Sequence, residues 1–404
     1  MARIEILPVD GPLRFATFCR LPRLLYAGTE GFAPPLDIER WSVFAHKLNP
    51  HYKLVEEQKF LARRDGQWVG RVMAQIYKPG VTPVGASNAQ FGALDAIDDV
   101  EVVRALTQAA EDWLRAKGAE RINGPFSPSV NKECGLLVDG FDATPMFFMP
   151  WHPPYLSHHL EALGYEKAQD LLSYRFEISS DESDKPARIS TRREWRDRLK
   201  LRPLNMKALK QGETALMTEL FNDGWSGNWG FVPFTKEEFD SDADALQYLV
   251  PADFGIVVEL DGVPQSFAIA LPNLNEILAD LNGRLFPFGW ARAFKRFRSH
   301  QFKSARLLLL GTRKTLQRSA TGGAIFLSLV EEMRRRHAKI RVPHLEAGWV
   351  LESNADMRRP IEMFGGKVDK IHRIYEKRLT VGGGEEAMRM RDGVTATQLQ
   401  DATS

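Results

Sequence analysis

The pattern of apolar and polar positions along the chain occurs twice, once in each half. Residues 60–66 (FLARRDG) and 256–262 (IVVELDG) are strand-like runs that end in Asp-Gly, a signal for a hairpin turn. Residues 160–164 and 361–365 end a helical pattern at a glycine, and a tyrosine follows each glycine by ten residues. We infer that the chain contains two copies of one structural unit.

Each copy shows the same order of predicted elements: strand, helices, β-hairpin, strand, helix, strand, helix, strand. This order predicts an α/β fold with a mixed sheet and excludes an all-α or all-β domain. We predict a first domain at residues 1–178, a polar connector at 179–199, a second domain at 200–380 and a flexible tail at 381–404. A chain of 404 residues is long enough for two such domains.

Composition narrows the classes of function. The 54 Lys and Arg nearly balance the 52 Asp and Glu, so any nucleic-acid or membrane binding must be local. The two cysteines cannot form a disulfide framework or a four-ligand zinc site, which favours a reducing compartment and no metal. No apolar secretory signal begins the chain, and no run approaches the roughly 18 apolar residues that span a bilayer. We therefore expect a cytoplasmic protein.

Residues 306–338 read as a buried strand, a loop rich in glycine and cations, and a helix. A loop of this kind, followed by a helix N-terminus, presents backbone N–H groups to an anion such as a pyrophosphate. Arg313, Lys314 and Arg318 would add positive charge. The alternative is an ordinary strand-to-helix turn with solvated cations.

Residues 317–322 (QRSATG) resemble the Q/R-x-x-G-x-G/A loop with which the GCN5-related N-acetyltransferase (GNAT) superfamily binds the pyrophosphate of coenzyme A, although Ala320 replaces the first glycine. Asn354, Glu362 and Gly365 match the following helix of that superfamily, whereas Ile361 occupies its usual tyrosine position. The resemblance implies two tandem GNAT-like domains, an acyl-CoA donor and no metal. The residues that it implies for acyl-CoA binding are Leu309, Leu310, Arg313, Gln317, Arg318, Ser319, Ala320, Thr321, Gly322, Gly323 and Asn354.

Only the second half carries this loop. The equivalent region of the first half, residues 91–99 (FGALDAIDD), is acidic and would repel a pyrophosphate. We therefore predict that the first half is a degenerate copy, and that the second half alone binds acyl-CoA and is catalytic.

Three further runs are similar to those of the bacterial ceramide synthases: residues 124–142 (GPFSPSVNKECGLLVDGFD), 153–155 (PPY) and 221–233 (FNDGWSGNWGFVP). This resemblance implies transfer of a long acyl chain from acyl-CoA to the amine of a sphingoid base such as 3-ketosphinganine. The product would be a ceramide-type lipid. The alternatives are an aminoacyl-tRNA-dependent transferase of the same fold, or a non-catalytic protein that binds acyl-CoA or RNA. The pyrophosphate loop favours the first function.

The acceptor site is predicted at residues 221–235, where aromatic rings alternate with polar groups and glycines. We interpret this segment as a loop that covers an amine-bearing substrate, because so many rings on a loop need something to cover them. The alternative is a loop that packs on its own core. The predicted substrate-binding residues are Asn222, Asp223, Trp225, Asn228 and Trp229.

The candidate general base lies on the next strand, residues 344–349 (HLEAGW). Alternation places His344 and Glu346 on one face of this strand, and burial would raise the pKa of a carboxyl group there. We predict Glu346 as the base, with His344 second and Asp223 as a further candidate. A purely structural role for His344 and Glu346 is the alternative. A strand amide near Leu309 or Leu310 would polarise the thioester oxygen.

A basic amphipathic helix is predicted at residues 290–303. Trp290, Phe294 and Phe297 fall on one face, and ten Lys or Arg but no Asp or Glu occur between residues 284 and 318. This pattern is typical of a helix that lies on a membrane surface, here the inner membrane. It would also attract CoA phosphates or RNA. The alternative is an ordinary surface helix that packs its rings inward.

Overall fold

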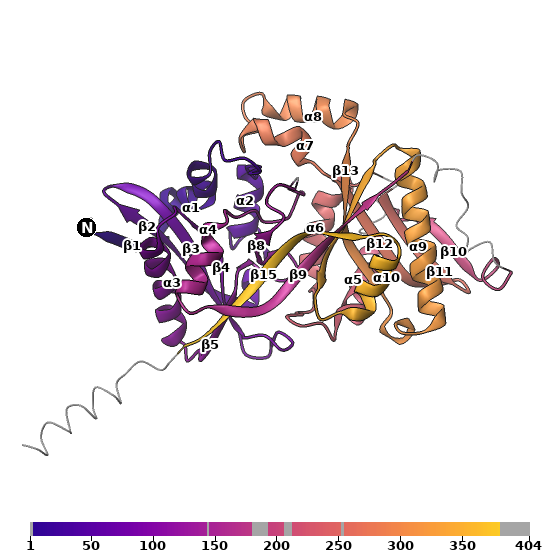
Figure 1. Cartoon of the computed structure of the whole chain (residues 1–404), viewed down its shortest axis with the longest axis horizontal. Coiled ribbons are helices and arrows are strands. Elements are labelled where there is room, and N and C mark those ends of the chain that lie inside the picture. The colour runs from indigo at the N-terminus through magenta and orange to yellow at the C-terminus, as the bar shows by residue number, and fades with distance from the viewer. Residues whose placement is uncertain (1–2, 144, 180–192, 206–211, 252–253, 380–404) are drawn as a thin grey trace, which may run out of the picture.

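The computed structural model describes residues 3–143, 145–179, 193–205, 212–251 and 254–379 (Figure 1). Residues 180–192 of the predicted connector and the predicted tail at 381–404 lie outside these described residues. Within the described residues, no helix has both the length and the apolar character needed to cross a membrane.

The elements of the first half are β1 (Ile4–Pro8), α1 (Gly11–Leu25), α2 (Asp37–Phe44), η1 (Pro50–Lys53), β2 (Val55–Arg64), β3 (Gln67–Tyr77), β4 (Ala89–Ala96), α3 (Val100–Arg115), β5 (Arg121–Gly124), β6 (Phe126–Ser127), β7 (Glu133–Cys134), β8 (Leu136–Asp139), α4 (Tyr155–Ala162) and β9 (Glu166–Glu177). In this half, β2 and β3 form a long hairpin, and the amphipathic helix α3 follows β4.

Apart from the short strands β6, β7 and β8, the second half repeats this order, with additional helices before its fourth strand. Its elements are β10 (Leu199–Pro203), α5 (Glu213–Trp225), α6 (Lys236–Leu249), β11 (Gly255–Leu260), β12 (Val263–Pro272), α7 (Asn275–Leu278), η5 (Ala279–Leu281), α8 (Gly289–Ser299), β13 (Ser304–Thr312), η6 (Lys314–Leu316), α9 (Ala320–Lys339), β14 (His344–Leu351), α10 (Ala355–Met363) and β15 (Lys367–Arg378). The additional helices are α7, η5 and α8. The order confirms the predicted mixed α/β fold.

The predicted Asp-Gly turns form in both halves. Asp65 and Gly66 connect β2 to β3, and Asp261 and Gly262 connect β11 to β12. All four residues have positive φ values, between 50° and 81°. This geometry matches the right-handed twist of the two strands, and aspartate and glycine adopt it more readily than most residues.

A single sheet of thirteen strands runs through both halves. Strands β1 to β5 occupy one end and β10 to β14 the other, and β15 and β9 lie between them (Figure 1). The last strand of each half therefore lies beside the strands of the other half: β9 pairs with β14, and β15 pairs with β5. The two strands also pair with each other, antiparallel, along most of their length.

The exchange of these strands is visible in two equivalent hydrogen bonds. The Tyr174 hydroxyl of β9 donates to Glu362 of α10 at 2.8 Å, and the Tyr375 hydroxyl of β15 donates to Glu161 of α4 at 3.0 Å. Each tyrosine thus binds the glutamate that belongs to the other half.

Burial of apolar side chains follows the same exchange. Tyr375 and Leu379 pack in the core of the first half. In return, Phe147 and the β9 residues Tyr174 and Phe176 pack in the core of the second half. Neither core is complete without residues from the other half, so the two halves should stabilise each other.

We predict that Tyr375→Ala lowers the free energy of unfolding by about 3–5 kcal/mol, because it leaves a cavity in a fully buried site. Amide protection measured by hydrogen exchange should fall in β4 and β5 of the first half, although Tyr375 belongs to the second half. Tyr248→Ala, at an exposed position, is the control. A loss of protection confined to residues 200–379 would contradict the exchange.

Candidate active site

The candidate site begins where two parallel strands separate. β13 and β14 pair only from Ser304 opposite His344 to Leu307 opposite Ala347. On its other edge, β13 continues to pair with β12 as far as Thr312, with a bulge after Leu307. Beyond Leu307, the edge of β13 that faces β14 pairs with no described strand, so backbone groups are left for another partner. One of them, the Leu310 carbonyl, accepts a hydrogen bond from the Trp225 indole at 2.8 Å.

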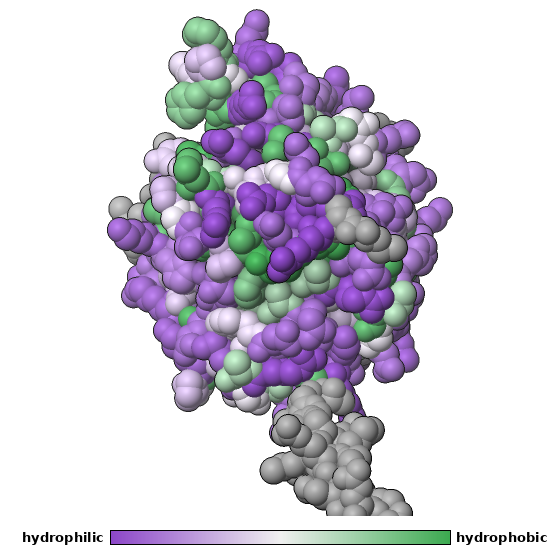
Figure 2. Space-filling model, turned by 90° about the vertical axis from the view of Figure 1, so that its left-hand side faces the viewer, coloured by the Kyte–Doolittle hydropathy of each residue, from purple (hydrophilic) through white to green (hydrophobic). Residues whose placement is uncertain are grey.

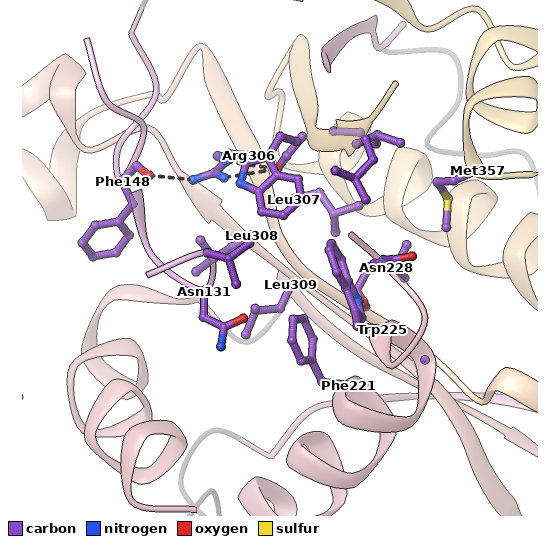
Figure 3. Close-up of a pocket in the computed structure, with 18 of the residues that line it drawn as sticks. Asn131, Phe148, Phe221, Trp225, Asn228, Arg306, Leu307, Leu308, Leu309 and Met357 are labelled. Atoms are coloured by element: carbon purple, nitrogen blue, oxygen red, sulfur yellow. Dashed lines mark hydrogen bonds between the residues drawn. The ribbon is translucent and has the colours of Figure 1, made fainter. Parts of the chain in front are cut away.

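A cavity of about 1300 Å³ occupies this opening and extends between the two halves. The second half lines it with residues 306–310 of β13, the start of α9, the segment around Trp225 and part of α10. The first half lines it with residues from α2 and from the segment 127–133, and with Phe147 and Phe148. In Figure 3, Asn131 of the first half and Leu308 and Leu309 of β13 face the same space.

The predicted anion loop forms at one end of this cavity. After β13, the short helix η6 leads to Gln317 and to Arg318, which has a φ of 63°. Ser319 then caps α9: its hydroxyl accepts a hydrogen bond from the Gly322 amide at 3.0 Å and donates to the Leu316 carbonyl at 2.6 Å. The first turn of α9 contains no acidic residue, so its positive dipole end is not neutralised within that turn.

The two glycines of this turn differ in their surroundings. A Cβ atom on Gly322 would lie 2.0 Å from the Leu316 carbonyl oxygen, so the turn itself requires glycine there. A Cβ atom on Gly323 would meet nothing within 4 Å, and Gly323 lines the cavity. The free space at Gly323 is therefore available to a ligand.

The cations of the loop have partners within the protein. Arg313 pairs with Glu219 at 2.8 Å, and Arg318 pairs with Asp356 at 2.6 Å on an exposed surface. The Lys314 ammonium donates to the Ser226 hydroxyl at 3.0 Å. An exposed pair such as Arg318 with Asp356 contributes little to stability, so a phosphate could replace the carboxylate at small cost.

The structure places most, but not all, of the residues predicted for acyl-CoA binding around the cavity. Those that line it are Leu309, Leu310, Gln317, Arg318, Ser319, Gly322, Gly323 and Asn354. Arg313, Ala320 and Thr321 do not line it. Asn354 also caps α10, because its side chain accepts a hydrogen bond from the Met357 amide at 3.2 Å. Ile361, at the tyrosine position of the GNAT helix, lines the cavity with its aliphatic side chain.

In the first half, the turn equivalent to the anion loop contains a carboxylate. Asp99 is the N-cap of α3, and its carboxylate accepts a hydrogen bond from the Glu101 amide at 2.9 Å. It also pairs with Arg64, whose guanidinium lowers the pKa of Asp99. This carboxylate occupies the helix N-terminus, which supports our prediction that the first half does not bind a pyrophosphate.

The prediction of a loop at residues 221–235 is partly wrong, because α5 continues to Trp225. Helical backbone at Asn222 and Asp223 directs both side chains into internal hydrogen bonds. Asn222 exchanges two hydrogen bonds of 2.9 Å with the backbone of Phe234, and Asp223 accepts one from the Lys314 amide at 2.7 Å. Neither lines the cavity, whereas Trp225, Asn228 and Trp229 do. Asp223 thus holds the anion loop in place.

The aromatic rings of residues 221–235 fit both interpretations of this segment, as a cover over a substrate and as a loop packed on its own core. Phe221, Phe231 and Phe234 are buried in the core of the second half, as a loop packed on its own core requires. The same three rings also line the cavity, together with Trp225, which stacks on Phe221 with ring centroids 5.0 Å apart. One apolar surface therefore belongs to both the core and the cavity wall.

The predicted base, Glu346, is fully buried and lies outside the residues that line the cavity. Its carboxylate accepts a hydrogen bond from the Lys370 ammonium at 2.5 Å. His344, at the start of β14, does not line the cavity either. Its Nδ1 atom lies 2.7 Å from Oε2 of Glu177. The catalytic role of both residues stays a prediction.

The first half contributes four charged residues to the cavity that our sequence analysis did not single out. They are Glu39 and Arg40 of α2, Lys132, and Glu133 of β7. Arg40 is buried and donates hydrogen bonds to both glutamates. Only the run 124–142, which contains Glu133, pointed to this region, and nothing in that pattern placed it opposite the anion loop.

The fold and cavity define a class of protein. No model of a known protein family matches the chain. A solved tandem GNAT protein from the clavulanic acid biosynthesis pathway aligns with 93% of this chain and 99% of its own, with a TM-score of 0.51 and 12% identity. The chain therefore has the fold of the tandem GNAT proteins, a class of acyltransferases.

Sequence comparison identifies the family within that class. The bacterial ceramide synthase of Caulobacter vibrioides is 38% identical over 382 residues, which cover 94% of this chain and 98% of the relative. Protein YghO of Escherichia coli is 40% identical over 362 residues, 90% of this chain and 92% of the relative. The chain belongs to the bacterial ceramide synthase family.

We predict opposite effects for two neighbouring substitutions. Gly322→Ala should destabilise the protein by about 1–3 kcal/mol, because the added methyl group forces the Leu316 carbonyl to move. Gly323→Ala should be neutral or stabilise it by up to about 1 kcal/mol, since alanine favours the helix and meets no neighbour. Urea unfolding of both variants measures the difference. Equal effects would contradict this geometry of the turn.

Proposed function

We propose that this protein transfers a long acyl chain from acyl-CoA to the amine of a sphingoid base, with 3-ketosphinganine as the acceptor. The observation that carries this proposal is the continuous cavity. It joins an anion-binding turn, an unpaired strand edge and an apolar chamber, in a chain of the bacterial ceramide synthase family. The product would be a ceramide-type lipid.

The donor would bind along β13. Its pyrophosphate fits the amides at the start of α9, where Gly323 leaves space, and its pantetheine arm fits the unpaired edge of β13. Amides of this edge near Leu309 and Leu310 could polarise the thioester carbonyl and stabilise the negative charge that develops on its oxygen. In this arrangement the second half alone binds the donor.

The acyl chain would occupy the apolar part of the cavity. Leucine, phenylalanine and tryptophan side chains dominate this part, among them Leu307, Phe221, Phe231, Phe326 and Leu345. A cavity of about 1300 Å³ exceeds the range of about 300–1,000 Å³ that is usual for small-molecule sites. This size supports a long acyl chain rather than an acetyl group.

The proposal is tested by incubating the purified protein with palmitoyl-CoA and 3-ketosphinganine. We expect release of free CoA together with an N-acyl product that mass spectrometry identifies. Gly323→Glu should abolish the reaction and the binding of palmitoyl-CoA in a calorimetric titration, with the melting temperature retained, because a carboxylate would occupy the anion site. Equal use of acetyl-CoA, or no product with any sphingoid base, would contradict the proposal.

We further propose that α8 and the turn before it contact the surface of an anionic membrane. The helix forms as predicted, and Phe286, Phe288, Trp290 and Phe294 are between 54 and 76% exposed. Figure 2 shows apolar side chains beside hydrophilic ones at the top of the molecule, where α7 and α8 lie in Figure 1. Phe297 departs from the predicted face, because it packs against Phe302 with ring centroids 6.0 Å apart.

The charges on α8 favour anionic lipid as the partner. Arg292, Lys295 and Arg298 surround the exposed rings, and no acidic residue lies in the helix. Arg296 is different, because it pairs with Asp280. Exposed rings beside cations are typical of a helix that lies in the membrane interface.

We predict that Trp290→Ala with Phe294→Ala reduces co-sedimentation with vesicles that contain anionic phospholipid, and that it leaves the melting temperature unchanged, since both rings are exposed. Replacing Arg292 and Lys295 with glutamate should reduce the same binding and its dependence on salt. Leu13→Ala with Leu24→Ala, at exposed positions in α1, is the matched control. Binding of all variants equal to that of the wild type would refute this surface.

A further inference from the structure

A buried group of two carboxylates and one guanidinium lies in the wall of the cavity that belongs to the first half. Arg40 donates to the two carboxylate oxygens of Glu133 at 2.7 and 2.5 Å. It also donates to Oε1 of Glu39 at 2.6 Å. Both oxygens of Glu133 are therefore engaged, whereas Glu39 uses only one of its two oxygens for Arg40.

The second oxygen of Glu39 has no partner. Oε2 of Glu39 is buried and accepts no hydrogen bond of normal length and angle from a described residue. A buried carboxylate oxygen that lacks a donor is costly, so such an atom indicates a missing partner. Within this group, two carboxylates and one guanidinium leave one net negative charge, which is complementary to an ammonium group. The buried Arg306 guanidinium, which also lines the cavity, acts electrostatically on Glu133.

Glu39 differs in this respect from the other carboxylates around the cavity. Asp242 pairs with Lys132, and Asp356 pairs with Arg318. Glu238 accepts hydrogen bonds from the Thr235 amide and hydroxyl at 3.0 and 2.9 Å. Among the described carboxylates that line the cavity, Glu39 is the one with a buried oxygen left over.

The surroundings of Glu39 suit a proton acceptor. Burial raises the pKa of the Glu39 carboxyl, the Arg40 guanidinium lowers it, Glu133 raises it, and the net shift is upward. Glu39 and Glu133 also line a second cavity of about 70 Å³, together with Arg71, Asp95 and His152. That cavity is polar and large enough for a water molecule, which could carry a proton away from the acyl-transfer site.

We propose that Glu39 binds the ammonium group of the acceptor and takes its proton, while Arg40 and Glu133 hold the carboxylate in position. This inference rests on the proposed function and specifies how the first half takes part in it. The amine of a long-chain base is partly protonated at neutral pH, although in 3-ketosphinganine the adjacent carbonyl and the nearby hydroxyl withdraw electrons and hold its pKa below that of lysine. It cannot attack a thioester until it loses that proton.

The protons and bonds of the reaction balance as follows. One proton passes from the ammonium to Oε2 of Glu39 and then to water. The free nitrogen forms a bond to the thioester carbon, and the bond from carbon to sulfur breaks. The nitrogen loses its second proton to the thiolate, which leaves as free CoA, and the amide keeps the third. Glu39 is again a carboxylate after it releases its proton.

The test compares Glu39→Gln with the wild type in the assay with palmitoyl-CoA and 3-ketosphinganine. Glutamine keeps the shape and one acceptor for Arg40 but cannot take a proton. We expect kcat to fall by about 10²–10⁴-fold, with the affinity for palmitoyl-CoA and the melting temperature retained. Glu237→Gln, at an exposed position of α6, is the matched control.

The pH profile separates a proton acceptor from a structural residue. In Glu39→Gln only the unprotonated amine reacts, so kcat/KM should rise with pH until the amine is fully unprotonated, and more steeply than in the wild type. A fully active Glu39→Gln, or a loss that has the pH profile of the wild type, would overturn this inference. If the wild type forms no N-acyl product, the proposed function itself fails.

Discussion

The exchange of β9 and β15 is the constraint on which the rest of the structure depends. Each strand completes the sheet and the core of the other half, and the hydroxyls of Tyr174 and Tyr375 bind glutamates across the exchange. Because the two halves cannot separate without exposing both cores, the segment 127–133 stays over the open edge of β13. The cavity between the halves is a consequence of that packing.

Within the cavity, the ends that we propose for donor and acceptor come from different copies of the same fold. The second half keeps a helix N-terminus without a bound carboxylate, which suits a phosphate. The first half has Asp99 at the equivalent place, and instead brings Glu39, Arg40 and Glu133 to the far wall. In the proposed function, one copy binds the anionic donor while the other presents negative charge to the cationic acceptor.

Local patterns were sufficient to predict much of the fold. The order of elements, the Asp-Gly turns and the glycines at the ends of α4 and α10 depend on contacts between near neighbours in the sequence, which composition and spacing report. The anion loop was found in the same way, because capping and the close approach at Gly322 involve residues within six positions of each other. The C-terminal extent of α5 was not predicted, because asparagine and aspartate are also common in turns. The hydrogen-bond partners of Asn222 and Asp223 lie far away in the sequence.

The sequence by itself determined two copies of a mixed α/β unit and the glycine-containing turn before α9, because these features rest on backbone preferences and local hydrogen bonds. The tertiary structure alone decided which half's strands each closing strand joined, since the pattern of a strand does not specify its partner. It also decided which carboxylates meet the cavity. Glu346 lies away from the cavity, beside Lys370, whereas Glu39, which no motif marked, lies in the cavity wall. Strand alternation predicts the face on which a side chain lies, but it does not predict which residues pack against that face.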